Sequence, residues 1–576
     1  MRQPYLIPRR RINALLASFV MFCLAIGYRI ISFQVVQSKA LTSEAEAFRL
    51  QSDVIPAERG DILDARGRPL ATNVPANRVS AVVAQLQDPQ HTAQVLAPII
   101  GRSASDIMGA ITQPGEEWVV LQRRLPEQAS QQIQALKLPG IVLNPELRRV
   151  YPMGDLASQV LGFVNDAYVG SYGVEGAYDS VVGGTPGKLV AQRDTSGNVI
   201  ALANSVLQPP IDGSDLVLTI DSAVQRIVET ALDQAIAQHG APSGTIVVQN
   251  PQTGAILAMA SRPSFDPNQY ATVTNASAFE NPATSAVYEP GSTFKVLIMA
   301  LGLSTGAVTP NTVHDGGSYR VLPGGAKVYN ALHAAFGPEN MMQILEHSSN
   351  LGAMWVSEQV GQDRLYPGLQ SFGLGKPTGI DLPDEAGGIL PLPGEPDWTL
   401  ASLYTNAFGQ GLAVTPLQLV NAASAVANGG TLMRPHVVQQ IRGADGMKAV
   451  SIRAIRRVIT PETARQLTGM LVEAVAASTA YQQYVAVPGY DIAAKTGTAQ
   501  VPSPGGGYDP TATIASVLGF GPASNPQFTV LVKIDRPQDT PWGESAAGPA
   551  FRTIFQQLLL LYALPPDHPV PVTSRP

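Results

Sequence analysis

The segment Glu289–Gly302, EPGSTFKVLIMALG, places a single lysine at the start of an otherwise apolar helix. Pro290 and Gly291 precede Ser292, which is therefore expected to begin the helix, where free backbone N–H groups favour negative charge. Lys295 lies one turn further along the same face. Apolar neighbours desolvate its ammonium group and lower its pKa, and a lysine close to neutrality can take the proton of a serine hydroxyl.

Taken alone, this serine–lysine pair is a weak signal, because an N-cap serine beside a snorkelling lysine is the better explanation of it. A second motif, Ser348-Ser349-Asn350, lies where one helical segment meets another. By itself it is explained by a helix cap. Together, the two motifs offer a nucleophile, a base, a second hydroxyl and an amide within one domain.

The third motif places Lys495, Thr496, Gly497 and Thr498 on a predicted strand among small residues. Its simpler explanation is an exposed edge strand, where lysines are common. The lysine and the threonines would present a cation and hydroxyl donors beside a groove, and we interpret the glycine as leaving room for a substrate along the strand. Together the three motifs predict a site with a serine nucleophile, a lysine base and a cationic groove beside a strand.

The elements around these motifs predict an α+β fold. A helix capped by Asp221 precedes a hairpin of two apolar strands, GTIVVQN and AILAMAS, near the start of the domain. Three strands (YDIAAKTGTAQ, TATIASVLGFGP and QFTVLVKIDRP) and a helix (AFRTIFQQLLLLYAL) close it. We expect one antiparallel sheet built from both ends, flanked by helices, with an all-helical insert over about 275–485.

The N-terminus carries a membrane signal. Three arginines at positions 9–11 precede the apolar run 12–36, which at about 25 residues is long enough to cross a bilayer as a helix. The arginines predict a single-pass protein of the bacterial inner membrane, with a cytoplasmic tail over 1–11 and an extracytoplasmic catalytic domain. A cleaved signal peptide is the alternative, but the run is long for one and the possible cleavage site, Ser38-Lys39-Ala40, is poor.

The rest of the chain divides by composition. Residues 37–210 are mixed and predict an elongated pedestal domain, residues 211–565 the catalytic domain, and residues 566–576 a proline-rich disordered tail. Within the pedestal, PAERGDILDARGRPLATN predicts two extended pieces around a turn at Arg66-Gly67, and GVEGAYDSVVGGTPGK predicts loops.

Composition excludes several classes of function. The net charge of −6 argues against nucleic acid as a partner. The single cysteine, Cys23, lies in the apolar run, so neither an internal disulfide nor cysteine catalysis is expected. Metal-ligand and nucleotide-binding motifs are lacking, so we expect no metal and no cofactor.

Longer stretches resemble the class B penicillin-binding proteins. YEPGSTFK, FGLGKPTGIDLPDEAGGILP, FGQGLAVTPLQLVNAASAVANGG and AAKTGTAQ are similar to the penicilloyl-serine-transferase domain of that family. RGDILDARGRPLA, RRVYPMGDLASQVLGFVN and GVEGAYD are similar to its pedestal, the dimerisation-type domain. One departure is Ala494, where glycine often stands. No stretch resembles a glycosyltransferase domain.

The resemblance implies a peptidoglycan D,D-transpeptidase that also binds β-lactam antibiotics covalently. It implies that Ser292 attacks a stem-peptide D-alanine carbonyl, that Lys295 takes the proton, and that the backbone N–H groups of Ser292 and Thr498 hold the oxyanion. Ser348 and Asn350 would pass a proton to the leaving amine and hold the substrate amide. Lys495, Thr496 and Thr498 would bind the terminal carboxylate.

Alternatives remain open at this point. LGFVN, the short pedestal and the early end of the chain resemble the septal cell-division type, and the alternative is lateral-wall synthesis. A serine β-lactamase and a β-lactam sensor are further rivals, although the sensor would need more chain before the anchor. The expected partners are stem peptides, the membrane, divisome proteins and a multi-span glycosyltransferase of the shape, elongation, division and sporulation (SEDS) family, which Arg29 in the anchor could contact.

Overall fold

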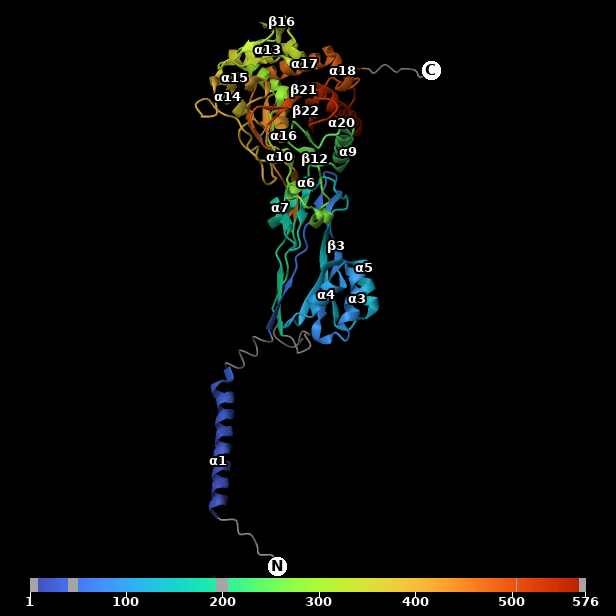
Figure 1. Ribbon diagram of the computed structural model, residues 1–576, viewed down its shortest axis with the longest axis vertical. Helices are drawn as coiled ribbons and strands as arrows, with labels where there is room; N and C mark the ends of the chain where they lie inside the picture. Colours follow the sequence, from blue (N-terminus) through green and yellow to red (C-terminus); the bar gives the residue numbers. More distant parts are fainter. Residues whose placement is uncertain (1–8, 40–49, 193–205, 504, 569–576) are drawn as a thin grey trace, which may run out of the picture. The chain divides into compact units, whose positions relative to one another are not determined.

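The computed structural model describes residues 9–39, 50–192, 206–503 and 505–568, and Figure 1 draws the remainder in grey. The chain divides into two compact units, which are considered separately below. The first unit comprises Met1–Glu58 and Gly184–Asp212, and the second comprises Arg59–Gly183 and Gly213–Pro576.

The first unit contains an apolar helix and a small sheet. Helix α1 (Arg9–Ile31) continues into a π-helical turn, η1 (Ser32–Val36). Together they are long and apolar enough to cross a membrane, and an 18-residue window within them has a mean hydropathy of 2.1. This confirms the predicted N-terminal helix, which begins at Arg9; residues 1–8 of the expected tail lie outside the described residues. The antiparallel sheet has the order β1-β8-β9. Its strands are β1 (Leu50–Ile55), β8 (Gly187–Gln192) and β9 (Val206–Gln208).

The first sheet of the second unit has the order β19-β18-β10-β2-β3-β4, with β5 also paired to β3. Gly67, with φ 81°, forms the turn between β2 and β3, as the sequence predicted. Because β10 pairs with both β2 and β18, the sheet joins strands from both sides of residue 210. Its strands are β2 (Ile62–Leu63), β3 (Pro69–Val82), β4 (Trp118–Pro126), β5 (Ile141–Val150), β10 (Asp215–Leu218), β18 (Val438–Gly443) and β19 (Gly446–Ala449).

Three helices cover part of this sheet. Asp88 and Ser103 cap α3 and α4 by accepting hydrogen bonds from backbone N–H groups of the first turn. The helices bury Leu96, Ile107 and Ile133 against the apolar side chains of β3 and β4, which forms a separate hydrophobic cluster. They are α3 (Pro89–Ile100), α4 (Ala104–Ile111) and α5 (Glu127–Leu136).

The segment from Gly173 to Lys188 corrects the sequence analysis. It was predicted as loops, but it forms two short helices, α7 (Gly173–Ala177) and α8 (Asp179–Val182), before β8 begins. The physical reason is tertiary: Glu175 of α7 is fully buried and pairs with Arg59 and Arg149 at 2.7 Å each. Such ion pairs hold a glycine-containing helix that local propensity would not form. Nearby lie α6 (Ser158–Leu161), β6 (Phe163–Val164) and β7 (Gly170–Ser171).

The central sheet of the second unit confirms the antiparallel arrangement predicted from both ends of the domain. Its order is β12-β11-β23-β22-β21, and every pairing is antiparallel. The hairpin near the domain start supplies two strands and the C-terminal segment supplies three. They are β11 (Ser243–Gln249), β12 (Ile256–Arg262), β21 (Ala493–Pro502), β22 (Tyr508–Gly521) and β23 (Phe528–Asp535).

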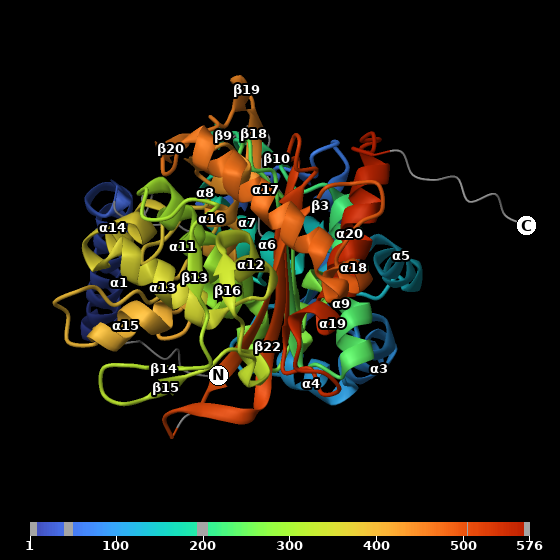
Figure 2. The same ribbon diagram turned by 90° about the horizontal axis from the view of Figure 1, so that it is seen from above.

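Helices pack on both faces of this sheet (Figure 2). Alternation along the strands places Val530 and Val532 in one core cluster with α9 and α20, and Leu531 in the other with α11, α16 and α17. Asp221 caps α9 as predicted, its side chain accepting from the N–H of Ala223. The helices are α9 (Ser222–His239), α11 (Lys295–Ser304), α16 (Pro416–Ala427), α17 (Pro461–Ala477), α19 (Gly543–Ala546) and α20 (Gly548–Leu561).

The insert is largely helical, but the expectation that it is entirely helical is wrong. Its further helices are α10 (Pro282–Ser285), α12 (Met341–Glu346), α13 (Asn350–Val360), α14 (Gln362–Ser371), α15 (Leu400–Thr405) and α18 (Thr479–Tyr484). Gly324 and Gly325, both at positive φ, form the turn of one of several two-stranded sheets. The short strands are β13 (Val313–Asp315), β14 (Arg320–Val321), β15 (Lys327–Val328), β16 (Pro338–Asn340), β17 (Thr431–Met433) and β20 (Ala454–Arg457).

The predicted disordered tail needs a partial correction. The carboxylate of Asp567 accepts from the Asp491 N–H at 3.0 Å, and the His568 ring lies 2.9 Å from the Asp491 carboxylate. These polar contacts fix the start of the segment 566–576 on the domain, and residues 569–576 lie outside the described residues.

Candidate active site

Ser292 lies in a single 3-10 turn, η5 (Gly291–Phe294), that runs directly into α11. The turn refines the predicted helix start, because the regular helix begins at Lys295. Gly291 adopts φ 58°, and a side chain there would lie 3.1 Å from the Cβ of Ala499 on β21. The close approach therefore sets the serine beside the strand. The first N–H groups of such a turn have no partner within the turn, so that of Ser292 can donate to a substrate.

Lys295 is almost fully buried, with 1% of its surface exposed, and its Nζ lies 2.9 Å from Ser292 Oγ. Burial lowers the pKa of Lys295 well below its usual value, and the positive charge of Lys495 lowers it further. The carboxylate of Glu339 acts in the opposite direction but is the smallest of the three causes. Burial and the charge of Lys495 both shift Lys295 towards the neutral amine, the direction that the apolar sequence around the lysine predicted.

The surroundings of Lys295 also orient its lone pair. The Nζ lies 2.6 Å from the carbonyl oxygen of Ser348 and 2.7 Å from Asn350 Oδ1, and both of these atoms can only accept hydrogen bonds. A neutral amine has two N–H donors and one lone pair. With the donors directed to these two oxygens, the lone pair is left facing Ser292 Oγ, the geometry of a general base.

Ser348 occupies the junction between α12 and α13, as the sequence predicted. Its backbone is in the left-handed region, with φ 54°, which is uncommon for a serine and is held here by bonds on both sides. This conformation brings its hydroxyl between two lysines: Ser348 Oγ lies 2.9 Å from Lys495 Nζ and 3.3 Å from Lys295 Nζ. The hydroxyl can therefore pass a proton between the base and a bound substrate.

Asn350 depends on a residue that the sequence analysis missed, Asn330. The Oδ1 of Asn330 accepts from the N–H groups of Asn350 and Leu351, at 2.8 and 3.1 Å, and so caps α13 from a distant part of the chain. Asn350 Nδ2 donates to the carbonyl of Tyr329 at 2.9 Å, which fixes the amide with Oδ1 towards the lysine. No local pattern marks Asn330 in the sequence, because its partners Asn350 and Leu351 lie 20 and 21 residues further along the chain.

Lys495, on the edge strand β21, is fully buried and its ammonium has three acceptors. Its Nζ donates to Ser348 Oγ at 2.9 Å, to Tyr481 Oη at 3.0 Å and to the carbonyl of Thr496 at 3.1 Å. Three N–H donors thus meet three acceptors, which suits the charged form. Tyr481, on α18, is the second residue that the sequence analysis missed.

Tyr481 also fixes Thr496. Its hydroxyl oxygen accepts from the Thr496 N–H at 3.1 Å and lies 2.9 Å from Thr496 Oγ1. Since the oxygen already accepts from Lys495 and from this N–H, its own proton is left for Thr496 Oγ1. The threonine hydroxyl proton then remains free to donate elsewhere.

The free edge of β21 presents backbone donors to the site. Among the described residues β21 pairs only with β22, and the Thr496 N–H points away from β22 to reach Tyr481. Alternate residues of a strand direct their N–H groups to the same side. The Thr498 N–H therefore also points to the free edge, and Thr498 Oγ1 accepts from the Gly543 N–H at 3.1 Å.

Gly497 is a point of close packing, a role that the sequence did not suggest. A side chain at this position would lie 2.6 Å from Ser516 Oγ and 2.9 Å from the methyl group of Thr293, in the turn that carries Ser292. The glycine is therefore needed for close packing of β21 against that turn. That it also leaves room for a substrate along the strand stays a prediction. Among the described residues, no group of three or more His, Cys, Asp or Glu side chains is placed to hold a metal ion.

Comparison with known proteins agrees with this geometry. Residues 244–556 match the penicillin-binding protein transpeptidase domain, and residues 54–218 match the penicillin-binding protein dimerisation domain. The chain is 34% identical to stage V sporulation protein D of Bacillus subtilis, over 97% of this chain and 87% of that protein. It is 31% identical to the peptidoglycan D,D-transpeptidase FtsI of Escherichia coli, over 96% of this chain and 92% of that protein.

A solved structure is similar as well. The crystal structure of penicillin-binding protein 3 of Mycobacterium tuberculosis, complexed with aztreonam, superposes with a TM-score of 0.69 at 27% identity, covering 90% of this chain and 99% of that chain. Both domain matches and the full-length relatives indicate a penicillin-binding transpeptidase, the type of enzyme that the buried serine–lysine pair also suggests. The chain belongs to the class B penicillin-binding proteins, peptidoglycan D,D-transpeptidases that carry a dimerisation domain beside the catalytic domain.

Proposed function

We propose that this transpeptidase crosslinks peptidoglycan stem peptides in septal wall synthesis, through an acyl-enzyme formed on Ser292. The observation that carries the assignment of the residues is the position of Lys295, whose buried Nζ lies 2.9 Å from Ser292 Oγ with its two donors directed elsewhere. A serine activated in this way attacks the carbonyl of the penultimate D-alanine, and Lys295 receives its proton. The N–H groups of Ser292 and Thr498 stabilise the developing oxyanion.

The second half of acylation releases D-alanine. The C–N bond breaks, and the proton held by Lys295 reaches the leaving amine through Ser348 Oγ, which lies 3.3 Å from Lys295 Nζ. An amine of a neighbouring stem peptide then attacks the ester, and Ser292 is regenerated with the crosslink as product. A β-lactam would follow the same first step, but its leaving amine stays attached to the acyl group and blocks the acceptor.

The substrate carboxylate is expected at β21. All three donors of Lys495 are already engaged, so we expect Lys495 to attract the carboxylate by its positive charge without a direct hydrogen bond. The hydroxyls of Thr496 and Thr498 would donate the hydrogen bonds to the carboxylate. Asn350 has one N–H of its amide uncommitted, because the other is held by the Tyr329 carbonyl and its oxygen by Lys295. That N–H can bind the substrate amide.

A crosslinking assay tests the proposal. Uncrosslinked glycan strands incubated with the full-length chain in detergent should yield dimeric muropeptides by mass spectrometry, with loss of one D-alanine per crosslink. Ser292→Ala should yield none. If the wild-type chain only removed D-alanine or hydrolysed penicillin with rapid turnover, the acceptor would be water, as in a carboxypeptidase or a β-lactamase.

The septal role and the orientation are proposed on resemblance. The arginines at 9–11 favour a cytoplasmic N-terminus, and we propose on that ground that the catalytic domain lies on the outer side of the inner membrane. A fluorescent fusion should gather at midcell in dividing cells. A fusion spread along the side wall would instead indicate the elongation role, and one confined to sporulating cells would indicate the role named for the Bacillus subtilis relative.

We also propose that the anchor pairs with a multi-span SEDS-family glycosyltransferase and with divisome proteins. Arg29 lies within the apolar helix, and its guanidinium carbon Cζ lies 5.1 Å from the centroid of the Phe33 ring. A charge at that depth favours a polar partner in a neighbouring helix. Replacing residues 12–36 by an unrelated membrane helix should break co-purification with the polymerase while penicillin acylation persists. Full retention of the complex would make the anchor a tether only.

A further inference from the structure

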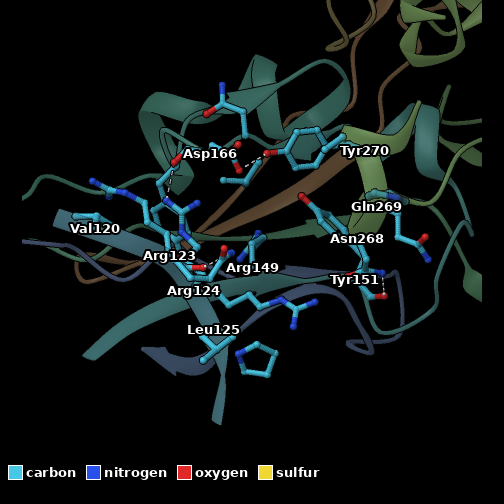
Figure 3. A pocket seen from close by; sticks show the side chains of 18 of the residues that line it. Val120, Arg123, Arg124, Leu125, Arg149, Tyr151, Asp166, Asn268, Gln269 and Tyr270 are labelled. Carbon is cyan, nitrogen blue, oxygen red and sulfur yellow. Dashed lines mark hydrogen bonds between the residues drawn. The ribbon is translucent and has the colours of Figure 1, made fainter. Parts of the chain in front are cut away.

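A cavity of about 800 Å³ lies in the second unit, and none of the proposed catalytic residues lines it. Its walls come from β4 and β5 of the first sheet, from the β6–β7 turn, and from a 3-10 segment, η3 (Pro267–Thr272), that precedes the Ser292 turn in the chain (Figure 3). Five arginines but only one acidic residue, Asp166, line it. The arginines are Arg102, Arg123, Arg124, Arg148 and Arg149.

Most of these guanidinium groups lack a close carboxylate. Arg102 and Arg124 donate to backbone carbonyls, those of Leu121 and Asp166, at 2.9 and 3.0 Å. Among the described residues, Arg148 takes part in no ion pair, and Arg123 approaches a carboxylate, that of Glu146, only at 3.7 Å. Backbone carbonyls do not neutralise a guanidinium charge, so the cavity carries an excess of positive charge.

Arg149 is the exception, and it is still incompletely satisfied. Its Nε pairs with Glu175 at 2.7 Å and its Nη1 donates to the Gly60 carbonyl, but its buried Nη2 has no partner among the described residues. A buried guanidinium donor without an acceptor is costly. An anion entering the cavity is one way to supply that acceptor.

The acidic residue of the cavity does not neutralise the arginines. The Asp166 carboxylate accepts from the hydroxyl of Tyr270 at 2.7 Å (Figure 3) and forms no ion pair among the described residues. Arg124 instead stacks over the ring of Tyr168, 4.7 Å from its centroid. Both of these residues have positive φ, 50° and 64°, a strained conformation that clusters at functional sites.

We propose that this cavity is a second binding site, which takes the carboxylates of an uncrosslinked peptidoglycan stem peptide. The inference rests on the proposed function, because that function brings such strands to the protein. Guanidinium groups bind carboxylates in a bidentate manner, and a stem peptide carries several carboxylates on a short chain. A concave site of this size fits a glycopeptide, whereas a folded acidic partner would need a far larger and flatter contact surface.

The test uses the full-length chain in detergent, first acylated with benzylpenicillin so that the catalytic site is filled. Isothermal titration calorimetry with an uncrosslinked disaccharide pentapeptide, released from cell wall by a muramidase, should then show one remaining site. Arg123→Gln/Arg148→Gln should weaken that binding at least about tenfold, the scale of a lost charge-assisted hydrogen bond. The matched control, Arg442→Gln/Arg465→Gln, removes two exposed arginines elsewhere and should leave it unchanged.

The comparison ligands separate the sources of the anion. The disaccharide without its peptide and inorganic phosphate should each bind at least about tenfold more weakly than the pentapeptide. The proposal is overturned if the acylated chain does not bind the glycopeptide, if the two double variants bind it equally, or if an unrelated acidic decapeptide binds as tightly. The acylation rate at Ser292 is measured for each variant, so that a failure of this second site is distinguished from a failure of the proposed function.

Discussion

Tyr481→Phe removes one hydroxyl and leaves the ring packing of α18 in place. In the wild-type chain that oxygen accepts from Lys495 Nζ at 3.0 Å and from the Thr496 N–H at 3.1 Å, and it lies 2.9 Å from Thr496 Oγ1. The variant leaves one donor of a buried ammonium and one buried N–H without a partner. It also frees the Thr496 hydroxyl to rotate away from the substrate carboxylate.

The cost can be estimated from these bonds. A hydrogen bond to a charged group contributes about 1.5–3 kcal/mol and a neutral one about 1 kcal/mol, so the unfolding free energy should fall by about 2–4 kcal/mol. For a domain of this size that lowers the Tm by roughly 5 °C. If about half of the loss appears in the acylation transition state, the second-order rate constant for benzylpenicillin acylation of Ser292 should fall about 5–30-fold.

Stopped-flow acylation and thermal unfolding measure both effects. Tyr484→Phe is the matched control, because Tyr484 lies on the same helix and its hydroxyl forms no hydrogen bond among the described residues. The control should acylate within about twofold of wild type. A Tyr481→Phe chain that acylates at the wild-type rate, despite a lower Tm, would refute the idea that Tyr481 orients Lys495 and Thr496. An equal loss in the control would indicate a general effect of helix packing.

Further predictions follow from the same geometry. Because burial and the charge of Lys495 lower the pKa of Lys295, the acylation rate should rise with pH through that pKa. Lys495→Gln should move this rising part of the pH–rate profile to higher pH, whereas Lys495→Arg should not. An unchanged profile in Lys495→Gln would contradict the coupling between the two lysines. The unfolded chain binds this proton more strongly than the folded one, so stability should rise with pH between the folded pKa and the ordinary lysine value, and Lys295→Met should lose that slope in chemical denaturation. Gly497→Ala should slow acylation at least about tenfold and lower the free energy of unfolding by about 1–3 kcal/mol, because the added methyl group overpacks the site. Gly469→Ala, at a position in α17 with open space around the added Cβ, should instead raise the free energy of unfolding by about 0.5–1 kcal/mol. Equal effects of the two changes in thermal unfolding would contradict the packing role of Gly497. Asn330→Ala removes the acceptor that caps α13 and should lower acylation about tenfold, while wild-type kinetics in that variant would show that the cap does not position Asn350.

The sequence predicted those features of the fold that depend on local pattern. Short segments are enough to predict the apolar run of α1, the cap at Asp221 and the alternation of β21–β23. The structure has all three where they were expected. The short helix α7 was missed because a buried ion pair from Glu175 to Arg59 and Arg149 decides it, and those partners lie far away in the chain.

The site shows the same limit. Ser292 and Lys295 are adjacent on one turn, so their pairing could be read from spacing. Tyr481 and Asn330 carry no motif, because their roles arise only when α18 and the 313–340 segment pack beside β21 and α13. Gly497 was recognised as special and was interpreted as leaving room for a substrate; the close approach of Thr293 and Ser516 adds a packing role that the sequence did not suggest.

The central claim is that Ser292 is the nucleophile, activated by Lys295, whose pKa burial lowers. Intact-mass spectrometry of the full-length chain after exposure to benzylpenicillin tests it most directly. The account predicts a single stable adduct of one penicillin per chain, mapped to Ser292 by peptide digestion, absent in Ser292→Ala and formed at least about 100-fold more slowly in a folded Lys295→Ala chain. An adduct that persists in Ser292→Ala, or wild-type acylation kinetics in Lys295→Ala with an unchanged Tm, would contradict the account.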